Sequence, residues 1–147
     1  MRIALDTNLL AYAEGVNGAQ RKQVSLGVVQ KLSTEDIVVP VQALGELFHV
    51  LVRKAGRTPV RARTAVLSWY DAFAVAETSV AVVLGATDLA AAHRLSIWDS
   101  VIVSAAAEAG CRLLITEDLQ DGFTWQGVTV ANPFAKVLHP LLDSLLN

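Results

Sequence analysis

Four acidic residues are placed along the chain where a folded domain would bring them together. Asp6 and Asp118 each follow a short apolar segment, Glu46 lies on the polar side of a predicted helix, and Asp99 lies near the start of another helix. Carboxylates gathered in one cleft repel each other, and a divalent cation that prefers oxygen ligands relieves this repulsion. The chemistry that such a group supports is metal-assisted hydrolysis, in which the ion activates a water molecule.

Each acid also has a simpler explanation. Asp6 could cap the helix that follows it, Glu46 could lie on a solvated face, and Asp118 could be a turn residue. Asp99 lies three residues after Ser96, and a capping box would use the same spacing. All of these explanations would have to hold at once, at sites that the predicted topology places together.

The segment around Asp99 is central to the predicted fold and site. A helix is expected from Ser96, a good N-cap residue, to Gly110, a typical stop. Asp99 falls on the apolar face of this helix, beside Ile102 and Ala106. A carboxylate that faces a core needs a partner, because leaving it unpaired there is costly.

Apolar segments alternate with helical ones along the chain. Strands are predicted over 2–5, 36–39, 79–83, 112–116 and 128–130, and helices over 9–12, 19–32, 41–55, 58–77, 86–95 and 96–110. This alternation predicts an α/β fold with a parallel sheet covered on both faces, in a single domain, 1–147. Chemistry in such folds collects at the carboxyl ends of the strands, where Asp6 and Asp118 are expected.

Basic residues are concentrated in one segment next to the Glu46 helix. Five of the twelve basic residues lie between positions 53 and 63 with no acid among them, namely Arg53, Lys54, Arg57, Arg61 and Arg63. A phosphate polymer needs such positive charge, so this segment is the predicted RNA-binding patch. A solvated corner between two helices explains the segment equally well.

Composition excludes several other classes of protein. The net charge of −2 is not that of a globally basic nucleic-acid binder, and the single Cys111 cannot form an internal disulfide. The chain has no Cys/His cluster typical of zinc and no glycine-rich phosphate loop. We expect no membrane segment and a cytoplasmic location. The apolar content of 53% predicts that a partner covers part of the surface.

These motifs, in this order, resemble the PIN domain, and more closely the VapC-type toxins of bacterial toxin–antitoxin pairs. The resemblance covers nearly the whole chain. It rests on Leu5-Asp6-Thr7-Asn8, on Glu46, on Trp98-Asp99-Ser100-x-Ile102, on Gly110-x-x-Leu113-x-Ile115-Thr116-x-Asp118, on Gly122 and Gly127-Val128, and on Asn132-Pro133-Phe134.

The resemblance implies a three-layer α/β/α sandwich with a parallel sheet of four to five strands. It implies Mg²⁺- or Mn²⁺-dependent endoribonuclease activity with the catalytic acids Asp6, Glu46, Asp99 and Asp118. Of these, Asp6, Asp99 and Asp118 are the predicted metal residues, and Glu46 completes the outer shell or helps to orient the water. By position, Thr116 is implied as a support or ligand and Asn8 as an organiser of the ligands. Asp121 is implied as an outer acidic residue.

The resemblance also implies a homodimer and a small antitoxin protein that wraps the toxin. Alternatives remain: a non-toxin PIN nuclease in RNA processing, a binding-only protein, or a signalling module with an acidic Mg²⁺ pocket. A signalling module of that kind needs a lysine after its last strand, yet none follows the segment 128–130 until Lys136. An aspartate-nucleophile phosphatase needs Asp-x-Asp where this chain has Asp6-Thr7-Asn8.

Overall fold

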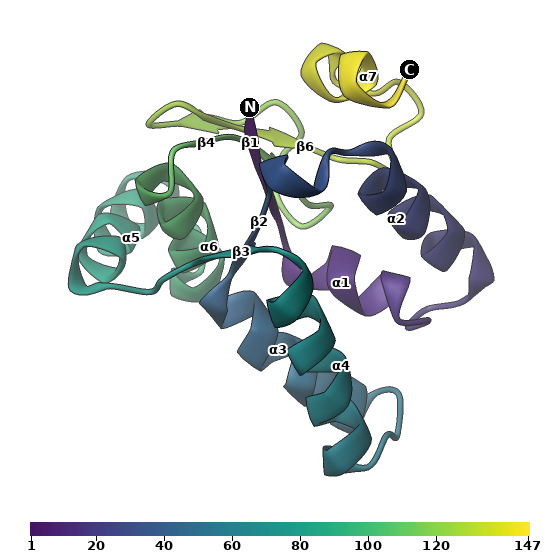
Figure 1. Ribbon diagram of the computed structural model, residues 1–147. Coiled ribbons are helices and arrows are strands. Elements are labelled where there is room, and N and C mark those ends of the chain that lie inside the picture. The colour runs from purple at the N-terminus through teal and green to yellow at the C-terminus, as the bar shows by residue number, and fades with distance from the viewer.

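The computed structural model describes all residues 1–147, arranged as a central sheet with helices on both faces (Figure 1). The sheet has six strands in the order β3-β2-β1-β4-β6-β5. All neighbouring strands are parallel except β5, which is antiparallel to β6. The strands are β1 (Arg2–Leu5), β2 (Ile37–Pro40), β3 (Ala74–Ala76), β4 (Cys111–Ile115), β5 (Thr124–Trp125) and β6 (Val128–Ala131). The predicted fold class is confirmed, with one strand more than expected.

The central strands are apolar on both faces because helices cover both faces. In β1 the residues Ile3, Ala4 and Leu5 are fully buried, and β2 and β4 are similarly apolar. Leu5 is in register with Ile115, so β1 and β4 end side by side. The Asp6 amide donates to the Ile115 carbonyl at 3.1 Å and extends this pairing by one residue.

The helices form two layers and one projecting hairpin (Figure 1). Helices α1 (Thr7–Ala13) and α2 (Ala19–Lys31) cover one side of the sheet, and α5 (Val80–His93) and α6 (Ile97–Glu108) cover the other. Helices α3 (Val41–Arg53) and α4 (Pro59–Ala72) project beyond the carboxyl ends of the strands. A 3₁₀ turn (Thr34–Asp36) precedes β2, and α7 (Pro140–Leu146) packs near α2. None of these helices has the length and apolar character needed to cross a bilayer.

The prediction of a strand over 79–83 is wrong. This segment begins α5, and Ser79 caps the helix by accepting a hydrogen bond from the Val82 amide at 3.2 Å. Strand β2 pairs with β1 on one side and with β3 on the other, and β3 begins at Ala74, two residues after α4 ends at Ala72. The β-branched run after Ser79 favoured a strand, but tertiary packing against α6 overrides that preference.

The helix around Asp99 forms as predicted. Ser96 caps it, with Oγ accepting from the Asp99 amide at 3.1 Å, and Gly110 ends it with a φ of +75°. Residues 100–106 are all buried, because α6 lies between α5 and the sheet.

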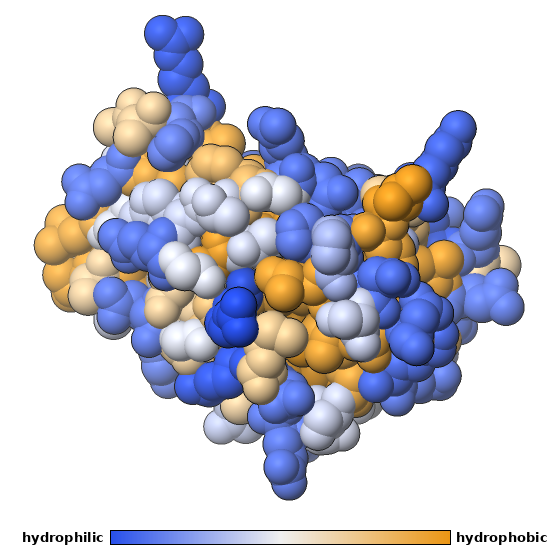
Figure 2. All heavy atoms as spheres, turned by 90° about the horizontal axis from the view of Figure 1, so that it is seen from above, coloured by the Kyte–Doolittle hydropathy of each residue, from blue (hydrophilic) through white to orange (hydrophobic).

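Apolar side chains also reach the surface. Figure 2 shows, from the end of the molecule that carries the N-terminus and α7, apolar atoms interspersed with hydrophilic ones. The large apolar residues with more than half of their surface exposed are Val60, Tyr70, Val80, Leu84, Trp98 and Val137.

Candidate active site

Asp6 lies at the carboxyl end of β1 and is almost fully enclosed. Its side chain caps α1 through Oδ1, which accepts from the Thr7 amide at 2.7 Å. Its other oxygen, Oδ2, accepts from the Thr116 hydroxyl at 2.6 Å. Only 6% of the residue is exposed. Asp6 is therefore both a helix cap and a carboxylate held rigidly at the sheet edge.

The surroundings of Asp6 disfavour its charged form. Burial raises the pKa of its carboxyl from 3.8 to about 7, although the hydrogen bonds from Thr116 and Thr7 act in the opposite direction. The charges of Asp118 and Glu46 raise it further. A buried carboxylate with like charges nearby is typical of a site that binds a cation.

Glu46 reaches the same edge from α3. Its Oε2 accepts from the Thr7 hydroxyl at 2.8 Å, and its Oε1 accepts from the Gln42 amide group at 2.7 Å. Gln42 also donates to the carbonyl of Trp98 at 3.0 Å. These contacts tie α3 to both α1 and α6, so Glu46 is not simply a solvated residue.

Asp118 follows β4 and is organised through Thr116. The Thr116 hydroxyl oxygen accepts from the Asp118 amide at 3.1 Å and from the Asn8 side-chain amide at 3.4 Å. Burial raises the pKa of the Asp118 carboxyl, and the charge of Asp99 raises it further. Nearby Asn8 and Lys54 act in the opposite direction. Thr116 thus links Asp6, Asp118 and Asn8 in one hydrogen-bonded group.

Asp99 completes the acidic set from the first turn of α6. Its amide is used by the helix cap, but its carboxylate makes no return bond to the Ser96 amide, so no capping box forms. Its charge acts on Asp118, while those of Asp118 and Glu46 act on Asp6. The structure therefore brings all four predicted acids into one electrostatically connected group.

The donor set fits a hard divalent cation. No three His, Cys, Asp or Glu side chains lie close enough to hold one ion between them. Mg²⁺ commonly uses one or two protein carboxylates and keeps several of its water molecules. Asn8 presents its Nδ2 toward Thr116 and Asp118, and its buried Oδ1 has no hydrogen-bond partner. The carboxylates offer oxygen ligands, as Mg²⁺ and Mn²⁺ prefer.

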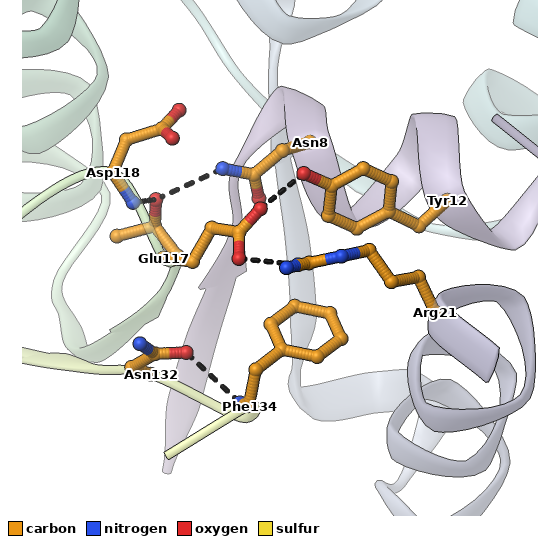
Figure 3. Close-up of polar contacts among 8 residues, drawn as sticks. Asn8, Tyr12, Arg21, Glu117, Asp118, Asn132 and Phe134 are labelled. Carbon is orange, nitrogen blue, oxygen red and sulfur yellow. Dashed lines mark hydrogen bonds and ion pairs between the residues drawn. The ribbon is translucent and has the colours of Figure 1, made fainter. Parts of the chain in front are cut away.

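A polar cluster that the sequence does not predict lies beside Asp118. Glu117 accepts hydrogen bonds from the Tyr12 hydroxyl and from the Arg21 guanidinium, and Phe134 packs edge-on against Tyr12 (Figure 3). The Asn132 side chain accepts from the Phe134 amide at 2.9 Å and fixes this part of the chain. Glu117 was visible as a neighbour of Asp118, but nothing in the sequence linked it to Arg21.

Asp121 and the predicted basic residues lie outside the group of four acids. Asp121 is exposed, and its carboxylate accepts from the Asn132 amide at 3.0 Å, so it braces the turn that precedes β5. In the basic segment, Arg57 pairs with Glu14 at 2.8 Å and is therefore used within the fold. The other four basic residues are exposed, and Lys54 acts on the pKa of Asp118.

Comparison with known proteins identifies the family of this chain. The sequence model of the PIN domain matches residues 3–121. The chain belongs to the PIN domain family. PIN domains are nucleases, and they generally use divalent metal ions.

Solved structures with the same fold include several toxins. VapC20 from Mycobacterium tuberculosis, a sarcin–ricin loop cleaving toxin, is 17% identical, with 76% of this chain and 86% of that chain covered and a TM-score of 0.65. A toxin–antitoxin complex from Klebsiella pneumoniae is 19% identical, with 90% of this chain and 98% of that chain covered and a TM-score of 0.67.

VapBC2 from Rickettsia felis, bound to a DNA fragment from its promoter, is 16% identical, with 90% of this chain and 98% of that chain covered and a TM-score of 0.65. At these identities the likeness concerns the PIN fold. A comparison with curated protein sequences gives no significant match.

Proposed function

We propose that this PIN domain is a metal-dependent endoribonuclease and the toxin of a toxin–antitoxin pair. The observation that carries the nuclease proposal is the coupled set of Asp6, Glu46, Asp99 and Asp118 at one edge of the sheet. The toxin proposal draws support from the fold shared with VapC20 and with the Klebsiella pneumoniae complex.

One or two of the carboxylates of Asp6, Asp99 and Asp118 would bind a Mg²⁺ or Mn²⁺ ion directly, and the remaining carboxylates would hold its water molecules. When bound, the ion lowers the pKa of a coordinated water and stabilises charge on the phosphate under attack. The hydroxyls of Thr7 and Thr116 donate to Glu46 and Asp6, but both threonines are buried and not open to a substrate. Hydrolysis by water is therefore the reaction that we propose.

The surrounding residues position these carboxylates. Thr116 orients Asp6 through its hydroxyl and holds the Asp118 amide, and Asn8 supports Thr116. Glu46 is fixed by Thr7 and Gln42, and we propose that it completes the outer shell or orients the water. We propose no catalytic role for Asp121, because its carboxylate is used by the Asn132 amide.

We further propose an RNA substrate, a small antitoxin partner and a homodimer. Among the predicted RNA-binding residues, Lys54 is the one whose charge acts on the pKa of Asp118, so we propose that it contacts the RNA near the acids. The exposed apolar residues of α5, Val80 and Leu84, are surface that a partner chain would cover.

The test is incubation of the purified protein with total cellular RNA in Mg²⁺, in Mn²⁺ and in EDTA. We expect discrete fragments that require the metal and disappear in Asp99→Asn. Glu108→Gln, at the other end of the same helix, is the matched control and should cleave normally. Cleavage that survives in EDTA or in Asp99→Asn would contradict the assigned site.

A further inference from the structure

A cavity of about 880 Å³ opens between α3 and the first turn of α6. Its walls include Glu46 and Asp99, two of the four acids, together with Gly45, His49 and Trp98. The cavity is therefore continuous with the acidic site. Gly45 has no side chain, and the space beside it is open, so α3 does not narrow the cavity at this point.

Trp98 has an exposed side chain on a backbone that hydrogen bonds hold in place. Trp98 is 64% exposed, whereas Ile97 before it packs against the core and Ser100 is buried. The Ser96 cap fixes the first turn of α6, and Gln42 donates to the Trp98 carbonyl at 3.0 Å. A large aromatic ring on a rigid backbone, with little role in the core, is suited to bind a flat ligand.

We propose that this cavity holds an unpaired nucleobase of the RNA, stacked on the indole of Trp98. This inference rests on the proposed function, because it supposes that the cleaved phosphodiester lies at the carboxylates. A nucleotide whose phosphate reaches Asp99 has its base within reach of the neighbouring residue, Trp98. Stacking on aromatic side chains is the common means by which proteins hold single-stranded nucleic acid.

A nucleobase fits this position better than a protein partner does. The cavity shares Glu46 and Asp99 with the acidic site, so its occupant lies beside the phosphate to be cleaved. Every base has a π face, so stacking on Trp98 adds affinity with little choice of sequence. Trp98 is thus a binding residue for the substrate and performs no proton transfer.

Binding of a fluorescent 12-nucleotide single-stranded RNA in Ca²⁺ tests the proposal without relying on cleavage. We expect Trp98→Ala to raise the Kd about ten-fold, and Trp98→Phe to raise it less, because Phe still stacks. Tyr70→Ala is the matched control, since Tyr70 is an exposed aromatic residue on α4 (56% exposed) away from the cavity. RNA should quench tryptophan emission in the wild type, and this quenching should be lost in Trp98→Phe.

A scan of the RNA with single abasic positions locates the base. At one position the abasic RNA should bind wild type and Trp98→Ala equally, because the stacked base is already missing. Equal RNA affinity of wild type and Trp98→Ala would overturn the proposal. So would a loss of affinity that accompanies dissociation of a dimer in light scattering, since Trp98 would then lie between protein copies.

Cleavage assays separate this proposal from the proposed function. RNA that binds through Trp98 but is not cleaved in Mg²⁺ or Mn²⁺ supports the nucleobase site and contradicts the nuclease. RNA that is cleaved with an unchanged KM in Trp98→Ala supports the nuclease and overturns the nucleobase site. If the folded protein binds no RNA, both proposals fail.

Discussion

Arg21 of α2 donates to the carboxylate of Glu117, the residue that separates Thr116 from Asp118 (Figure 3). The guanidinium carbon lies 5.1 Å from the ring centre of Tyr12 and 4.7 Å from that of Phe134. A fixed cation therefore pairs with the acidic side chain that directly precedes Asp118. The same contacts tie α2 to the loop after β4, which presents Asp118.

Arg21→Gln should strengthen metal binding while it weakens folding only slightly. The charge of Glu117 raises the pKa of Asp118, and without Arg21 this charge is no longer balanced. A divalent cation gains more from this added negative charge than a proton does, so the Mg²⁺ dissociation constant measured by calorimetry at pH 7 should fall several-fold. Since Arg21 is 39% exposed, the loss in the free energy of unfolding should stay below about 1 kcal/mol.

Arg112→Gln is the control for this experiment, because Arg112 is an exposed arginine on β4 without an acidic partner. It should leave the dissociation constant unchanged. Equal Mg²⁺ affinity in Arg21→Gln and the wild type would show that the Arg21–Glu117 pair does not act on the acidic site.

Asp6→Asn should stabilise the metal-free protein at alkaline pH. The pKa of Asp6 is raised from 3.8 to about 7 on folding, so the folded state binds the proton more tightly than the unfolded state. Stability from this group is present below pH 4 and is lost as the pH rises through 7. In EDTA, the unfolding free energy of the variant relative to wild type should increase by roughly 2 to 4 kcal/mol between pH 4.5 and pH 8.

Urea unfolding across this pH range measures the difference. Asp88→Asn is a control, because Asp88 is exposed on α5, and its difference from the wild type should stay flat with pH. A flat difference for Asp6→Asn as well would mean that Asp6 remains charged in the folded protein at neutral pH.

Much of the fold follows from local patterns in the sequence. The apolar segments around Ile3, Val38 and Leu114 predict the central strands, and Ser96 with Gly110 predicts the bounds of α6. The segment after Ser79 was predicted wrongly as a strand, because its β-branched residues favour strands while its contacts with α6 require a helix. The two-residue strand β5 is too short to leave a periodic pattern.

The candidate site was predictable to the extent that topology controls it. Asp6 and Asp118 follow neighbouring parallel strands, so the sheet alone brings them to one edge. The pairing of Arg21 with Glu117 joins residues 96 positions apart. It depends on how α2 packs, and the sequence carries no local sign of it. The ion pair between Arg57 and Glu14 could not be predicted for the same reason, since it depends on the packing of α3 and α4 against α1.

Divalent metal should stabilise the folded protein in a pH-dependent way. Mg²⁺ or Mn²⁺ binds only the assembled site, so it raises the melting temperature. Because the ligands must lose their protons, the rise should be larger at pH 8 than at pH 5.5. Differential scanning fluorimetry measures the rise, which should shrink in Asp118→Asn and persist in Asp88→Asn. A rise of equal size at both pH values would point to binding away from Asp6 and Asp118.

Gly85→Ala should loosen the packing that holds α6, and with it Asp99, against the sheet. A Cβ added at Gly85 would lie 2.8 Å from the Oγ of Ser104, which is buried and donates to the Val82 carbonyl. This clash costs about 1 to 3 kcal/mol and outweighs the gain of up to about 1 kcal/mol in helix propensity. Chemical denaturation should therefore show a lower free energy of unfolding.

The double variant Gly85→Ala/Ser104→Ala decides whether this clash is the cause. Without Oγ, the nearest Ser104 atom to the new methyl is Cβ at 3.9 Å, which is an ordinary contact. Ser104→Ala alone loses a hydrogen bond worth about 1 kcal/mol. We therefore expect the double variant to be at least as stable as Ser104→Ala, with a coupling energy of about 1 kcal/mol or more. Additive losses would mean that α5 is disturbed at Gly85 through some other contact, such as that with Trp125.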